Sequence, residues 1–99
     1  MHLISARNLK LAALYHPDLA ENIQIICKNI QDATWRHLLD LQQVYPSAEA
    51  VGNFTVINIK GNRYRLIPSI DYEKQVVYFK YFLTHAEYDK EEWKNDYYY

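Results

Sequence analysis

The sequence contains little cysteine, glycine or proline, and no excess of either charge. One cysteine, two glycines and three prolines occur among 99 residues, and the formal net charge is −1. A single thiol cannot form an internal disulfide. A net charge near zero provides no overall basic surface for nucleic acid. The length suits one compact domain over residues 1–99 and is too short for two.

Long hydrophobic runs are absent as well. The first five residues have no basic start and no apolar run, so they are not expected to be a signal peptide. No stretch approaches the ~20 apolar residues of a membrane span. Cys27 lies in an apolar segment, which favours a buried structural thiol over a reactive one. We therefore expect a cytoplasmic protein without membrane association.

The first half of the chain has the apolar spacing of helices. Hydrophobic residues make up 49% of the sequence, enough for a core. One helix is expected from Ala6 to a point before Pro17. Asp18 is a candidate N-cap for a second helix and Thr34 for a short third one, and a loop should follow to about Asn53. The second helix carries an apolar stripe of Ile23, Ile26, Cys27 and Ile30.

The second half changes to strand-like patterning. Residues 54–60 and 63–70 read as two strands joined by Gly61-Asn62, which is a hairpin signal. Residues 76–83 form a third apolar run of strand length.

Two further segments complete the predicted fold. Thr84 is expected to cap a short helix, with Glu87 closing a capping box, and residues 1–4 could add an edge strand. Helices followed by strands predict an α+β fold. The N-terminal helices should pack on one face of a small antiparallel sheet, and a short C-terminal helix should follow it.

The hairpin register predicts a cluster of cations. With Gly61-Asn62 as the turn, Lys60 lies opposite Arg63 and Asn58 opposite Arg65, on one face of the sheet. The other face is mostly apolar and should face the helices; it holds Thr55, Ile57, Ile59, Tyr64 and Leu66. Facing cations are unfavourable on a sheet. Two interpretations stay open: the side chains splay into water at the hairpin tip, or they bind an anion such as phosphate.

The third strand adds aromatic residues to this face. Strand alternation places Tyr78, Lys80 and Phe82 beside Arg65, and it assigns the core face to Val77, Phe79, Tyr81 and Leu83. Cations interleaved with rings suit single-stranded RNA, because the charges contact the backbone and the rings stack on bases.

Four segments match a known family in order and spacing. They are Met1-His2-Leu3-Ile4, Tyr45-Pro46-Ser47, the Gly61-Asn62-x-x-Arg65 hairpin and Thr84-His85-x-x-Tyr88-Asp89-Lys90. Over nearly its whole length the chain resembles the HigB toxins, RelE-like components of bacterial toxin–antitoxin systems. The resemblance implies a RelE-like α+β fold and cleavage of mRNA on translating ribosomes. It also implies a HigA-like helix-turn-helix antitoxin. The toxin would bind operator DNA only through this antitoxin.

The resemblance also implies roles for individual residues. Arg65 should hold the scissile phosphate with help from Lys80, and His85 and Tyr88 should transfer protons. Supporting RNA contacts are expected from Lys60, Arg63 and Tyr78. No metal or cofactor is expected, since the histidines have no ligand-like spacing. The RNA's own 2′-hydroxyl would then be the nucleophile, with general acid–base help from the protein.

Charge supports a competing hypothesis. RelE-like toxins are usually basic, whereas residues 87–96 carry five acidic and two basic side chains. This segment could be a solvated helix, could keep the protein soluble, or could mimic RNA over the cleft. His85 alone could equally be a surface histidine near a helix cap. The alternative to a nuclease is therefore a non-catalytic module that keeps the fold and binds RNA or a protein.

Overall fold

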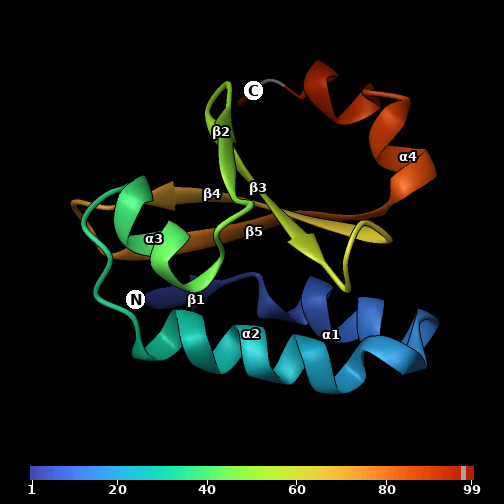
Figure 1. Ribbon diagram of the computed structural model, residues 1–99, viewed down its shortest axis with the longest axis horizontal. Coiled ribbons are helices and arrows are strands. Elements are labelled where there is room, and N and C mark those ends of the chain that lie inside the picture. Colours follow the sequence, from blue (N-terminus) through green and yellow to red (C-terminus); the bar gives the residue numbers. More distant parts are fainter. Residues whose placement is uncertain (97) are drawn as a thin grey trace.

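The order of helices and strands follows the expected change from helix to sheet (Figure 1). The computed structural model describes residues 1–96 and 98–99, apart from the side chains at positions 6 and 8. Its elements are β1 (His2–Ile4), α1 (Ala6–Tyr15), η1 (Pro17–Leu19), α2 (Ala20–Asp32), α3 (Leu38–Val44), β2 (Glu49–Val51), β3 (Phe54–Ile59), β4 (Tyr64–Asp71), β5 (Val76–Thr84), α4 (His85–Asp89) and η2 (Glu92–Asn95).

The five strands form one sheet in the order β1-β5-β4-β3-β2. The edge strand β1 is present, but it pairs parallel with β5, so the sheet is mixed and not wholly antiparallel. The loop expected before Asn53 contains the short strand β2, which pairs antiparallel with β3. The predicted register of the β3–β4 hairpin is confirmed: Asn58 pairs with Arg65 and Ile59 with Tyr64.

Two predicted helix caps are wrong. Asp18 lies in η1, and α2 begins at Ala20 with no side-chain cap. The Asp18 carboxylate instead contacts the Lys60 ammonium at 3.1 Å. Thr34 precedes an extended segment, and α3 begins at Leu38. The capping box of α4 is confirmed, since the Thr84 amide donates to Glu87 Oε1 and the Glu87 amide donates to Thr84 Oγ1.

The sheet has a core on each face. Helices α1 and α2 cover one face, whereas α4 and the end of the chain lie on the other (Figure 1). The helix-side core includes Leu9, Leu19, Ile23, Ile26, Ile30, Leu41, Ile57, Ile59, Leu66, Val77 and Phe79. The buried residues of the second core are Phe54, Val56, Ile67 and Trp93. Trp35 and Trp93 are both buried and serve as packing residues.

A bulge in β5 changes which side chains share a face. Ile67 pairs with Tyr81 but Pro68 pairs with Phe79, so Lys80 has no partner in the ladder. Alternation is shifted by one residue beyond this point. Phe82 therefore packs on the helix side, and Tyr81 and Leu83 join the second core, which is the reverse of the predicted arrangement. The sequence pattern failed here because strict alternation assumes an unbroken ladder.

Candidate active site

Arg65 lies on the sheet face that the C-terminal segment covers. Its side chain was expected to be exposed, yet the residue is only 7% exposed. Its Nη1 atom donates to the carbonyl oxygens of Asn62 at 2.9 Å and Tyr64 at 3.2 Å. A buried guanidinium needs such acceptors to offset the loss of water. The hairpin tip therefore fixes the position of this charge.

Tyr88 covers the Arg65 guanidinium. The central carbon of that group lies 5.0 Å from the centre of the Tyr88 ring, a cation–π distance. Tyr88 also stacks on Trp93, with ring centres 5.4 Å apart and planes 15° from parallel. Burial raises the pKa of the Tyr88 phenol, although the charge of Arg65 opposes this. The phenol therefore keeps its proton at neutral pH.

His85 is fixed to the same end of the sheet through its backbone. Its amide donates to the Arg63 carbonyl at 2.8 Å, which ties the first turn of α4 to the start of β4. The imidazole is half exposed, and its Nδ1 lies 2.9 Å from an oxygen of Asp89. A hydrogen bond from Nδ1–H to this carboxylate leaves Nε2 as the basic nitrogen. Asp89 was given no role from sequence, although its spacing of four residues from His85 on a helix is the signal for such a pair.

Lys80 and Tyr78 lie away from Arg65. Arg65 pairs with Leu83, and Lys80 is three residues earlier in β5, about 10 Å along the strand. The Lys80 ammonium lies 4.7 Å from the centre of the Tyr98 ring. Ser69, Tyr78, Lys80 and Tyr98 together line a pocket of about 340 Å³.

Lys60 and Arg63 do not form the facing pair that the register suggested. Both belong to the turn between β3 and β4, which spans residues 60–63 and not two residues. Lys60 has a φ of 52° and contacts Asp18 beside the helices, away from Arg65. Arg63 is exposed next to His85. Of the seven residues predicted for the site, the structure groups Arg63, Arg65, His85 and Tyr88.

This group offers acid–base chemistry next to positive charge. An imidazole and a protonated phenol lie on α4, Arg65 lies near the start of β4, and Arg63 lies in the turn just before it. Within the described part of the chain, no three histidine, cysteine, aspartate or glutamate residues gather in a way that could hold a metal ion. The described helices are also too short or too polar to cross a membrane.

The sequence comparisons agree with this geometry. The model of a family described as "HigB_toxin, RelE-like toxic component of a toxin-antitoxin system" matches residues 19–91. The chain belongs to the HigB toxin family. It is 29% identical over 92 residues to the mRNA interferase toxin HigB of Escherichia coli (strain K12), covering 90% of this chain and 88% of the relative. The HigB mRNA interferases of Escherichia coli O157:H7 and Shigella flexneri match to the same extent.

The HigB family match includes the whole candidate site. The matched range ends at residue 91, so it contains Arg65, His85, Tyr88 and Asp89. It ends before Trp93 and Tyr99, which both contribute to the second core in this chain. An α+β fold with an open five-stranded sheet is consistent with a RelE-like toxin.

Proposed function

We propose that this chain is an endoribonuclease that cleaves mRNA and thereby inhibits translation. The observation that carries the proposal is the position of α4, where the His85 backbone contacts Arg63 and the Tyr88 ring covers Arg65. Membership of the HigB family supports it, as do the three relatives named mRNA interferases.

The proposed reaction uses the RNA as its own nucleophile. The 2′-hydroxyl attacks the adjacent phosphorus, the bond to the 5′-oxygen breaks, and the products are a cyclic 2′,3′-phosphate and a free 5′-hydroxyl. His85 accepts the proton from the 2′-hydroxyl through Nε2, and Tyr88 donates a proton to the leaving oxygen. Arg65, aided by Arg63, stabilises the charge that develops on the phosphate. Asp89 holds the imidazole in its reactive tautomer.

A second RNA contact is proposed around Lys80. The pocket that it shares with Tyr78 and Tyr98 combines an ammonium with exposed rings. Such a surface suits one nucleotide beside the scissile bond, since the rings can stack on a base and the cation can contact a phosphate. Lys80 then guides the strand and does not take part in the chemistry.

Family membership supports a proposal for the partners of this chain. We propose that cleavage takes place on mRNA at the ribosome in the cytoplasm, because a nearly neutral protein gains little affinity for free RNA from charge alone. A HigA-like helix-turn-helix antitoxin would neutralise the toxin, and would provide its only link to operator DNA.

Substituting His85 tests the reaction. His85→Ala should slow mRNA cleavage by roughly 10²–10⁴-fold, the usual contribution of one general acid or base. Growth after induced expression and primer-extension mapping of cut mRNA provide the measurement, with circular dichroism as the check on folding. His37→Ala is the matched control, because His37 is also an exposed histidine near an aspartate, 3.8 Å from Asp40, but precedes α3.

Two conservative variants complete this test. Tyr88→Phe removes only the hydroxyl and keeps the ring between Arg65 and Trp93. Asp89→Ala should reduce cleavage less than His85→Ala, and should shift the imidazole ¹⁵N resonances away from the Nδ1–H tautomer. If His85→Ala and Tyr88→Phe both cut mRNA like the parent, the protein is a binding module and not a nuclease of this kind.

A further inference from the structure

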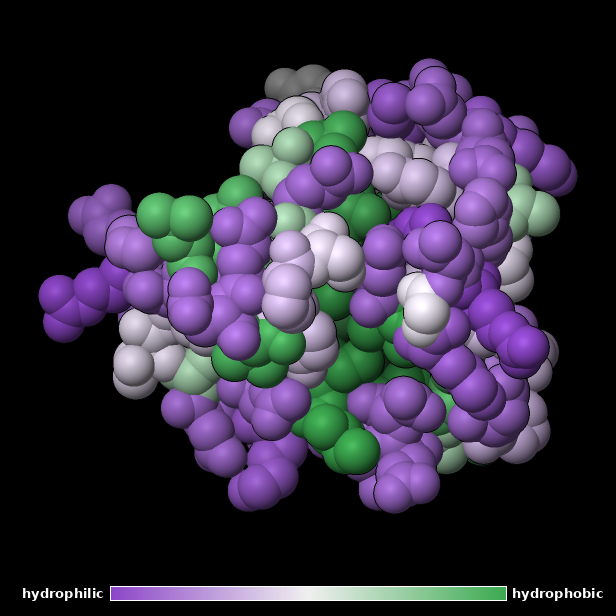
Figure 2. Space-filling model, in the orientation of Figure 1, coloured by the Kyte–Doolittle hydropathy of each residue, from purple (hydrophilic) through white to green (hydrophobic). Residues whose placement is uncertain are grey.

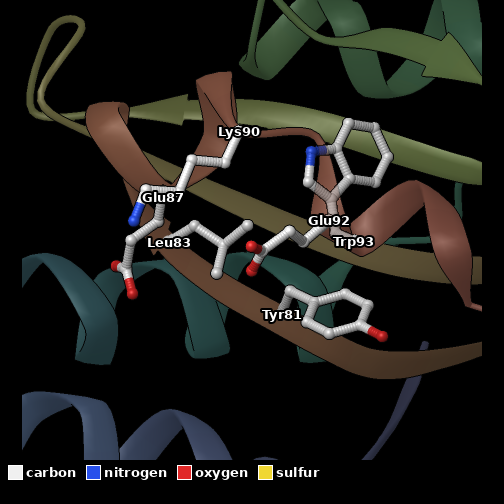
Figure 3. Close-up of a pocket in the computed structure, with 6 residues that line it drawn as sticks. All are labelled: Tyr81, Leu83, Glu87, Lys90, Glu92 and Trp93. Carbon is white, nitrogen blue, oxygen red and sulfur yellow. The ribbon is translucent and has the colours of Figure 1, made fainter.

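A small pocket lies between β5 and the C-terminal segment. Tyr81, Leu83 and Trp93 form its apolar wall, and Glu87, Lys90 and Glu92 complete the lining (Figure 3). Its volume is about 240 Å³, which suits a single side chain better than a larger ligand. In Figure 3 the Glu92 carboxylate lies between Leu83 and the two aromatic rings.

The charge around this pocket selects against RNA. Residues 87–96 carry five acidic and two basic side chains, and hydrophilic side chains cover the region of α4 (Figure 2). Glu87, Glu92 and Lys90 give the lining itself a net charge of −1, which repels a phosphate backbone and attracts a cation. Among protein side chains, arginine fits such a lining best. Its flat guanidinium can lie against an aromatic ring while its N–H groups donate to a carboxylate.

We propose that this pocket receives an arginine side chain from a protein partner. The guanidinium would lie against the half-buried Tyr81 ring, next to Trp93, and donate to Glu92 and Glu87. The inference goes beyond RNA cleavage, since it assigns a docking point for a basic protein segment. In a toxin of this family the antitoxin is the natural source of that segment.

The pocket is joined to the candidate active site by stacked rings. Trp93 lines the pocket and stacks on Tyr88, and Tyr88 covers the Arg65 guanidinium. An arginine docked next to Trp93 would therefore be separated from Tyr88, the residue proposed to donate the proton, by one ring. A partner bound here would be placed to obstruct the approach of RNA to α4.

Short peptides test the proposal on the full-length protein. The probes are acetyl-Gly-Arg-Gly-amide, acetyl-Gly-Lys-Gly-amide and guanosine monophosphate, each titrated while the indole N–H resonance of Trp93 is followed by NMR. The arginine peptide should shift this resonance saturably and more tightly than the lysine peptide. Binding should weaken as salt is raised, because salt screens the contact between the guanidinium and the carboxylates.

Charge-neutral variants locate the binding site. Glu92→Gln combined with Glu87→Gln should weaken binding of the arginine peptide by at least about tenfold, because a tenfold loss is expected for each charge-assisted contact. Glutamine at position 87 can still complete the capping box with Thr84. Glu73→Gln is the matched control, since Glu73 is exposed in the turn between β4 and β5. Equal binding in the double variant, or a shift produced only by the nucleotide, would overturn the proposal; the RNA-cleavage assay is unaffected by either outcome.

Discussion

The two faces of the sheet are covered by different kinds of structure. On one face, α1 and α2 bury a broad core of aliphatic side chains whose spacing follows helix and strand periods. On the other face, the last part of the chain buries four residues under a set of packed rings. Trp93 lies at the centre of this set, in contact with Phe54, Tyr88 and Tyr99. Arg65 and Tyr88 of the candidate active site lie on this second face.

The two faces of the sheet should differ in how easily their covers open. A broad core built from periodic elements resists local opening, whereas a small cover held by short elements can open without loss of the sheet. The residues proposed for catalysis sit at the edge of the smaller cover, where access can change. The aromatic cover also fixes Tyr88 against Arg65, which a bare sheet face could not do.

Two neighbouring residues of β4 allow each core to be perturbed on its own. Leu66 packs toward the helices and Ile67 toward the C-terminal segment, and both are fully buried. Leu66→Ala should lower the free energy of unfolding by about 2–5 kcal/mol and should destabilise the whole fold. Ile67→Ala should cost less, because the smaller core can give way locally. Denaturant unfolding measures both losses.

Amide hydrogen exchange, measured on the same two variants, distinguishes local from global opening. Ile67→Ala should reduce amide protection mainly in residues 88–96, with α1 and α2 unchanged. Leu66→Ala should reduce protection throughout the described chain. If the two variants lose the same stability and the same protection, the two faces form one cooperative core and the comparison fails.

The helix-covered face could be predicted from sequence far better than the other. The apolar stripe of α2 and the hairpin register needed only residue spacing, and both are confirmed. The bulge at Lys80 carries no sequence signal, because alternation alone cannot show an unpaired residue. For the same reason Phe82 was assigned to the wrong face.

The candidate site could be predicted only in part. The motif containing His85 and Tyr88 identified α4 and its capping box, and the register placed Arg65 on the correct face. The burial of Arg65 was not predicted, because the second face is covered by Tyr88, Trp93 and Tyr99, whose packing depends on tertiary contacts. The Lys60 side chain lies away from the predicted site because it forms an ion pair with Asp18, which is 42 positions earlier in the sequence.

Two glycines with similar backbones provide a second, smaller test. Gly52 and Gly61 have φ values of +60° and +67°. A Cβ atom at Gly52 would lie 2.6 Å from the Tyr99 carbonyl oxygen, whereas one at Gly61 would meet nothing within 4 Å. Gly61→Ala should cost about 1–2 kcal/mol from backbone strain alone. Gly52→Ala should cost more, since it also displaces the end of the chain.

The fluorescence of Trp93 separates these two glycine variants. Tyr99 contacts Trp93, with ring centres 5.7 Å apart, so its displacement should change the environment of the indole. Gly52→Ala should alter the emission of the folded protein, and Gly61→Ala should not. Equal stability losses with unchanged emission in both variants would show that Tyr99 adds nothing to the second core.

The smallest expected effect concerns the bond between Tyr81 and Asp96, which ties the C-terminal segment to β5. The hydrogen bond from the Tyr81 hydroxyl lowers the pKa of the Asp96 carboxyl below its ordinary value of 3.8. A carboxyl with a lowered pKa in the folded state stabilises the fold above its ordinary pKa, and this contribution is lost as the pH falls through the folded value. Asp96→Asn should therefore reduce stability slightly at pH 7, and the difference from the parent should shrink below pH 4. Denaturant unfolding at several pH values measures this difference, and Asp32→Asn, which affects an exposed ion pair on α2, serves as the control. A difference that grows toward low pH would mean that the charge of Asp96 does not hold the cover of the second face in place.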